Sequence, residues 1–136
     1  MNVRSRLVSE QGSVAVAGLL LSLALVMLIG TGVDIAHAFI VRRDLTAIAD
    51  NAALAGSQQL DLQAWRDGTL ALSPLAAEQA AETELAANPH ITGSATADTS
   101  SITVQAREAF PTMVLRLVGI ADLTVAATAT ATPRQP

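Results

Sequence analysis

The feature that most constrains this chain is the segment Val14–Val33, an uncharged run of 20 residues without proline. The hydrocarbon core of a bilayer is about 30 Å thick, so a helix needs about 20 residues to cross it. What remains of the chain is rich in alanine and threonine and has few large hydrophobic side chains to build a core. The sequence therefore predicts one membrane-spanning helix attached to one small domain of marginal stability.

A cleaved secretory signal is the alternative interpretation of the same run. Arg4 and Arg6 precede it, and residues 36–38 match the A-x-A pattern of a cleavage site. However, the run is longer than the usual apolar region of a signal, which has about 7–15 residues. Asp34 also places a charge in the would-be cleavage region. We favour an uncleaved anchor and keep secretion after cleavage behind Ala38 as an alternative.

The charges on either side of the run do not decide its orientation. Arg4 and Arg6 flank one end, and Arg42 and Arg43 flank the other. The rule that basic residues stay on the cytoplasmic side therefore gives no preference. Only the free N-terminal amine favours a cytoplasmic N-terminus.

Composition excludes several classes of function. The net charge is −4, and no basic stripe is present, which argues against binding to nucleic acid. Cysteine is absent, so there are no disulfides and no thiolate metal sites. His37 and His90 are far apart in the sequence, and Glu78, Glu82 and Glu84 are expected on a solvated helix face. We therefore expect no enzyme activity, no cofactor, no metal and no small-molecule substrate.

A helical pattern continues beyond the apolar run. Apolar residues recur at alternating spacings of three and four, which is typical of one face of a helix. A single helix over residues 14–60 would be roughly 70 Å long at 1.5 Å per residue, with its second half projecting as a stalk. The residues of this stripe, which we expect to pack against partners, are Ala38, Val41, Leu45, Ile48, Ala52 and Ala55.

Small residues gather in the first half of the membrane segment. Gly18 and Ser22 are four residues apart, a spacing that lets a second helix approach closely. Ordinary use of small residues in an alanine-rich chain is the alternative explanation. We expect this pair to mark the helix-packing surface in the membrane.

The rest of the chain predicts a small α+β domain of two helices and two to three strands. Residues 61–73 are expected to form a loop, and a helix over 74–87 begins at Pro74 with Ser73 as its cap. Alternation of polar and apolar residues predicts strands. The expected segments are a weaker strand over 91–97, a strand over 101–107, a short helix over 111–118 closed by Gly119, and a strand over 123–132.

The predicted organisation has four parts. Residues 1–12 form a cytoplasmic leader, and residues 13–33 form the transmembrane helix. Residues 34–60 form an extracytoplasmic stalk helix. Residues 61–136 form the small α+β domain with a short C-terminal tail.

Four parts of the N-terminal half together resemble a known family. They are Gly12–Val16 at the membrane entry, Val33–Ala36 at the exit, the pair Arg42 and Arg43, and the segment LTAIADNAALAG at residues 45–56. This pattern resembles the TadE/TadG-like proteins of Tad (Flp) pilus assembly. The resemblance implies a single-pass protein of the bacterial inner membrane, with its N-terminus inside and its C-terminal domain outside. Its partners would be other proteins of the pilus or a related secretion system, contacted through the N-terminal helix.

The resemblance also bears on the branch of the family. In the TadE/TadF branch a prepilin peptidase cuts after a glycine at the membrane entry, and the bond between Gly12 and Ser13 matches this position. That branch has a glutamate as the fifth mature residue, whereas this chain has Ala17. The C-terminal segment over residues 110–131 is also similar to the end of TadG-like proteins. We therefore favour the TadG-like branch and leave N-terminal processing open.

Two functions from different classes remain. The leading hypothesis is a non-enzymatic component of a pilus or secretion machine, either a minor pilin or pseudopilin or an assembly factor. The alternative is a membrane-anchored binding module unrelated to pili, in which the α+β domain is the working part.

Overall fold

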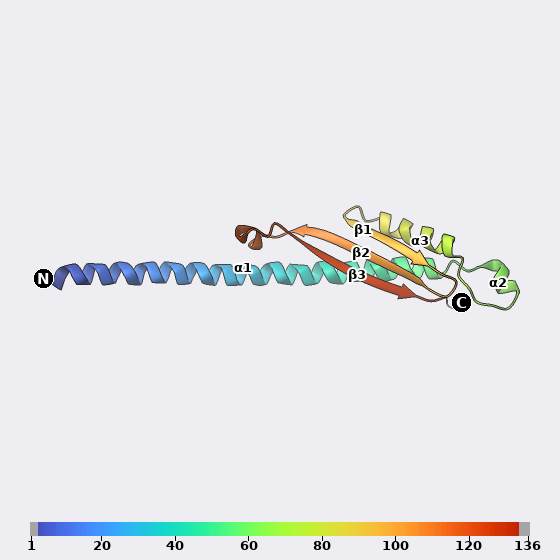
Figure 1. Ribbon diagram of the computed structural model, residues 1–136, viewed down its shortest axis with the longest axis horizontal. Helices are drawn as coiled ribbons and strands as arrows, with labels where there is room; N and C mark the ends of the chain where they lie inside the picture. Colours follow the sequence, from blue (N-terminus) through green and yellow to red (C-terminus); the bar gives the residue numbers. More distant parts are fainter. Residues whose placement is uncertain (1–2, 134–136) are drawn as a thin grey trace. The chain divides into compact units, whose positions relative to one another are not determined.

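A computed structural model describes residues 3–133, with side chains described from residue 12 onward. The fold is α+β, as predicted, and consists of a long apolar helix followed by a small domain with a three-stranded sheet (Figure 1). The elements are α1 (Val3–Ser57), α2 (Leu62–Arg66), α3 (Pro74–Ala86), β1 (Ile91–Ala97), β2 (Ile102–Pro111), the 3₁₀ helix η1 (Leu115–Val118) and β3 (Asp122–Ala131).

The chain divides into two compact units. The first unit consists of the N-terminal part of α1, up to residue 36, and residues 112–121, which connect β2 to β3. The second unit consists of residues 37–111 together with the segment that begins at residue 122. It therefore holds the C-terminal part of α1, the helices α2 and α3, and the whole sheet.

The sheet of the second unit is antiparallel in the order β1-β2-β3. Ile102 of β2 pairs with Ala97 of β1 on one side and with Ala131 of β3 on the other. Hairpin connections join the strands without a crossover, because consecutive strands are neighbours and run in opposite directions. Figure 1 shows the three strands side by side, with α3 beside β1.

The core of this unit lies between the sheet and two helices. Alternate residues of β2 and β3 point into it, as the period of two along a strand requires. Small side chains predominate, which lets the helices come close to the strands. The buried residues are Leu45, Ala49, Ala52 and Ala53 of α1, Leu72 before α3, Ala77, Ala81 and Leu85 of α3, Ile102, Val104 and Ala106 of β2, and Ala127 and Ala129 of β3.

Gly56 shows how closely α1 approaches its neighbours. A Cβ atom at this position would lie 2.8 Å from the carbonyl oxygen of Ala77 and would overlap the side chain of Ile102. Since the Ala77 carbonyl is backbone, it cannot move aside as a flexible side chain would. Gly56 is therefore a contact residue of the core, and α1 ends one residue later, at Ser57.

The turn between β1 and β2 is closed by Asp98. Its carboxylate accepts hydrogen bonds from the hydroxyl of Ser100, at 2.7 Å, and from the backbone N–H groups of Ser100 and Ser101. These bonds favour the charged form, the Ser100 hydroxyl most of all, and lower the pKa of Asp98 below its ordinary value of 3.8. Asp98 thus forms an Asx turn between the two strands.

Several element boundaries differ from the sequence predictions. The expected loop over 61–73 contains α2, because the Asp61 carboxylate accepts hydrogen bonds from the N–H groups of Gln63 and Ala64 and caps this short helix. The first helix ends at Ser57 rather than at residue 60. β2 extends to Pro111, which leaves only the 3₁₀ turn η1 of the short helix expected over 111–118.

The helix α3 has nearly the predicted bounds. The side chain of Leu75, in its first turn, is 67% exposed. Ala77, Ala81 and Leu85 are buried. Ser73 is the N-cap residue, but its side chain makes no capping hydrogen bond with any described residue. Two of the three buried residues are alanines, whose small side chains allow close packing against the sheet.

Candidate functional site

The N-terminal part of α1 is a candidate membrane anchor. The helix contains a segment long and apolar enough to cross a bilayer, and no residue in the most apolar part of that segment is buried. Apart from Met27, the large side chains between Val14 and Val33 keep 54% to 73% of their surface exposed. In water such a surface would be costly, since each buried CH₂ group contributes about 0.8 kcal/mol. The division of α1 into leader, span and stalk stays a prediction.

The second feature of this unit is the segment 112–121, which we call the hairpin tip. The backbone N–H of Thr112 donates to the carbonyl of Ala121 at 2.9 Å, and the Thr112 hydroxyl donates to the carbonyls of Ile120 and Ala121. Between these ends the chain forms η1 and reverses at Gly119, whose φ of 95° lies in the left-handed region that favours glycine. The tip is therefore a closed loop with a defined backbone.

Asp34 joins the hairpin tip to α1. Its Oδ1 atom accepts a hydrogen bond from the N–H of Met113 at 2.9 Å. Its Oδ2 atom accepts from the N–H groups of Val114 and Leu115, at 2.8 and 2.9 Å. The residue is only 4% exposed. The N–H groups at the start of a helical turn have no acceptor within the turn, and the Asp34 carboxylate provides one for them. The residues joined in this way are 79 to 81 positions apart in the sequence.

A glycine permits this contact. A Cβ atom on Gly30 would lie 2.9 Å from the Cβ of Val114, so any larger residue would push the hairpin tip away from α1. Met27 and Thr31 on the same side of the helix are half-buried. These positions, with Asp34, form one helical face, which the hairpin tip covers.

The sequence analysis did not find this role for Asp34. The residue enters there only as a charge that argues against cleavage behind Ala38. The only signal in the sequence was an acid directly after an apolar run, and nothing local connects it to residues 113–115. The contact depends on the return of the chain through two strands.

Gly18 and Ser22 lie on the opposite side of α1. Nine residues separate Gly18 from Met27, which is about two and a half turns of an α-helix. A Cβ atom on Gly18 would meet no other described atom within 4 Å. The hydroxyl of Ser22 donates to the Gly18 carbonyl at 2.8 Å. This surface is open in the single chain, with no unsatisfied hydroxyl.

The stripe that we expected to face partners lies largely inside the second unit. Leu45 and Ala52 are fully buried in its core, and Ile48 packs against that core. Ala38, Val41 and Ala55 are half-buried. Most of the surface of this stripe is therefore used within the chain, and its contact with partners stays a prediction.

Gly12 and Ser13, the possible cleavage position, are exposed residues inside the helical segment. Nothing in the described part of the structure covers them.

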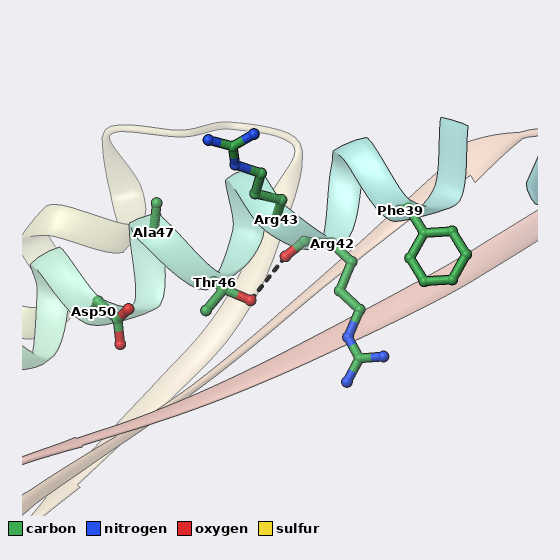
Figure 2. Close-up of a pocket in the computed structure, with 6 residues that line it drawn as sticks. All are labelled: Phe39, Arg42, Arg43, Thr46, Ala47 and Asp50. Carbon is green, nitrogen blue, oxygen red and sulfur yellow. Dashed lines mark hydrogen bonds between the residues drawn. The ribbon is translucent and has the colours of Figure 1, made fainter. Parts of the chain in front are cut away.

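The polar side chains that the structure describes in the second unit do not converge on one point. A shallow concavity lies along α1 between Phe39 and Asp50, where Arg42 and Arg43 point in different directions (Figure 2). The hydroxyl of Thr46 is bonded to the Arg42 carbonyl at 2.8 Å. All residues that line it come from one helix, so it is an open surface and not an enclosed site.

The remaining candidates have local structural partners. The ring of His37 packs edge-on against Phe110, with 5.1 Å between ring centroids, and His90 is exposed. Glu78, which we expected on a solvated face, is half-buried and its Oε1 accepts from the N–H of Ala97 at 2.9 Å. Among the described residues, no three His, Asp or Glu side chains gather where they would hold a metal ion.

Comparison with known proteins identifies one related family. Residues 12–66 match the family model described as putative Flp pilus-assembly TadE/G-like. The match covers less than half of the chain and contains the candidate membrane anchor and the α1 residues of the core. It does not distinguish the TadE from the TadG branch. No curated protein and no solved structure matches this chain.

Proposed function

We propose that this chain is a non-enzymatic, membrane-anchored component of a Tad/Flp-type pilus or a related secretion system. The observation that carries the proposal is the family match over residues 12–66, which begins where the apolar part of α1 begins. The chain would serve as a minor pilin or pseudopilin, or as an assembly factor. Its prominent features are an exposed apolar helix and a docked apolar loop, which suit contacts in and beside a membrane.

The proposed location is the bacterial inner membrane, with the N-terminus in the cytoplasm and the second unit outside. The resemblance to the family supports this orientation, and the two arginines on each side of the apolar run do not oppose it. Ala17, where a pilin of the TadE/TadF branch has glutamate, supports the TadG-like branch. In that branch we expect an uncleaved N-terminus.

The proposed contact surface for partner helices is the open face of α1 at Gly18 and Ser22. This face suits close helix packing because Gly18 has no side chain and the Ser22 hydroxyl is already bonded within the helix. The face is also free of the hairpin tip, which covers the opposite side of α1. Apart from the hydrogen bond between them, neither residue has a described contact that a substitution would break within the chain.

Gly18→Ile tests this function directly in the native host, with Ala24→Ile as the matched control. Both residues are exposed on the membrane helix, but they face different directions. We expect Gly18→Ile to abolish or strongly reduce pili at an unchanged protein level in the membrane, while Ala24→Ile leaves pili intact. If deletion of the gene leaves piliation and secretion unchanged, the proposed function is wrong.

The first residue of the mature chain distinguishes an assembly factor from a pilin-like subunit. Intact mass and N-terminal sequencing of the protein from its native membrane would show where the mature chain begins. A start at Met1 supports an assembly factor, and a start at Ser13 supports a pilin-like subunit. A start near Phe39 would remove Asp34 and the entire apolar run, and would contradict membrane anchoring.

A further inference from the structure

We infer that the hairpin tip, residues 112–121, inserts into the lipid bilayer beside α1, on the side of the membrane that holds the sheet. This inference rests on the proposed anchoring of α1 in a membrane. It adds a second membrane contact, formed by the chain between β2 and β3. The bilayer would then hold the protein at two points that are distant in sequence.

The position of the hairpin tip on α1 gives its depth. Its contacts are with Gly30 and Asp34, and the apolar run ends at Val33. At 1.5 Å per residue, Gly30 lies about 5 Å inside the end of that run. Because the run is about as long as the hydrocarbon core is thick, its last turn marks the edge of that core. The hairpin tip therefore lies at the boundary between acyl chains and headgroups.

The side chains of the hairpin tip suit that boundary. Four large apolar residues are exposed there, namely Met113 at 74%, Leu117 at 73%, Val118 at 61% and Ile120 at 44%. A group of exposed apolar side chains on one short loop is typical of a membrane or protein contact. Arg116 is the one charged residue of the segment, and its long side chain can reach the headgroups while its stem stays in the apolar layer.

The backbone of the hairpin tip meets much of the requirement that lipid imposes, since seven of its ten N–H groups donate to acceptors within the protein. Irregular backbone is costly in the hydrocarbon region unless its N–H and C=O groups are bonded within the protein. Asp34 accepts the N–H groups of residues 113, 114 and 115. The N–H groups of residues 112, 117, 119 and 120 donate to carbonyls within the same segment. A loop exposed to water would not need this internal bonding.

Asp34 itself fits the same interpretation. A carboxylate near the apolar core is costly when isolated. Here the carboxylate is buried and accepts hydrogen bonds from three backbone N–H groups of the hairpin tip. These bonds replace the hydrogen bonds that water would donate to an exposed carboxylate. A protein partner could also cover the apolar side chains. Lipid is favoured because the hairpin tip lies against the very helix whose other large side chains are exposed along the whole apolar run.

The test uses the full chain reconstituted in vesicles of phosphatidylcholine and phosphatidylglycerol. Because the chain has no cysteine, a single cysteine can carry an environment-sensitive fluorophore at a chosen position. Leu117→Cys reports on the hairpin tip. Leu21→Cys reports on the membrane helix, and Thr128→Cys, on the exposed face of β3, is the aqueous control. Each label is exposed to a lipid carrying a quencher near the headgroup, or to iodide in the buffer.

We expect lipid quenching of the label at residue 117 that is several-fold stronger than at residue 128, with weak quenching by iodide. If residue 117 is quenched by iodide as strongly as residue 128 while residue 21 is shielded from iodide, the inference fails and anchoring stands. Shielding of residue 117 from both quenchers would indicate a second copy on the hairpin tip and would also overturn the inference. If residue 21 is open to iodide, the anchoring itself is wrong.

A second variant tests the part played by Asp34. In the chain labelled at residue 117, Asp34→Ala removes the acceptors for three N–H groups of the hairpin tip. We expect the label to become accessible to iodide, while a label at residue 21 stays protected. A label at residue 117 that keeps its full lipid quenching in Asp34→Ala would show that Asp34 does not hold the hairpin tip in the bilayer.

Discussion

The two units use one helix in opposite ways. In the first unit α1 exposes large apolar side chains such as Leu21, and the buried acid Asp34 accepts hydrogen bonds from backbone N–H groups. In the second unit α1 buries mainly small side chains, Ala49 and Ala52 among them, against the sheet. This difference agrees with the surroundings that we propose for each part, lipid for the first and a protein core for the second. A helix that faces lipid needs only a long apolar surface, whereas a helix in a thin core must fit its neighbours closely.

The largest effect on stability is expected from the core of the second unit. Leu45→Ala removes a fully buried side chain and should lower the free energy of unfolding by about 2–5 kcal/mol. The change should appear as faster hydrogen exchange of the β2 amides in detergent. Leu54→Ala on the same helix is the control, because Leu54 is 51% exposed and should change stability by about 0.5 kcal/mol or less. Equal effects of both substitutions would contradict the assigned core.

The corresponding substitution in the first unit should act on membrane insertion and not on the core. Leu21→Arg places a charge near the middle of the apolar run, at an expected cost of about 2.5–3.5 kcal/mol for insertion. We expect the variant to be lost from the membrane fraction. Thr128→Arg, on the exposed face of β3, should stay in that fraction. Normal membrane retention of Leu21→Arg would contradict the proposal that the first unit is in the membrane and the second unit is outside it.

A change at Asp34 should be smaller and confined to the first unit. Asp34→Ala leaves three N–H groups without their acceptor, and an unsatisfied buried group costs about 1–3 kcal/mol. We expect faster exchange of the amides of residues 113–115 in detergent, with little change for residues 102–106. Asp44→Ala, an exposed acid on the same helix, is the control and should alter neither group. A uniform loss of protection would mean that the two units unfold together.

The smallest effect is expected at the exposed turn of the second unit. The pKa of Asp98 is lowered in the folded protein, first by the Ser100 hydroxyl, so the charged carboxylate stabilises the turn above the unfolded value of 3.8. This contribution is lost as the pH falls through the lowered pKa. We expect Asp98→Asn to be less stable than the unchanged chain at neutral pH, with a difference that shrinks below about pH 4. A difference that does not depend on pH would contradict this origin.

Local patterns predicted most of the elements because each pattern reports on nearby residues. The alternation of Leu123, Val125 and Ala127 with polar or smaller residues predicted β3, and these three side chains do face the core side. The bounds of β1 agree with the prediction for residues 91–97. The helix α2 was missed although Asp61 could have signalled a cap, because a five-residue helix has too little periodicity to recognise.

The sequence by itself determined that α1 is a continuous helix with an apolar N-terminal half, and that the segment over residues 12–66 has the TadE/G-like pattern. These properties depend on the order of residues along one element. Only the tertiary structure decided that Gly56 and the alanines of α1 contact the sheet, and that Asp34 holds residues 113–115. Both contacts join segments far apart in the chain, and they form only because the antiparallel strands return the chain to the helix. Periodicity within one element cannot reveal such a pairing.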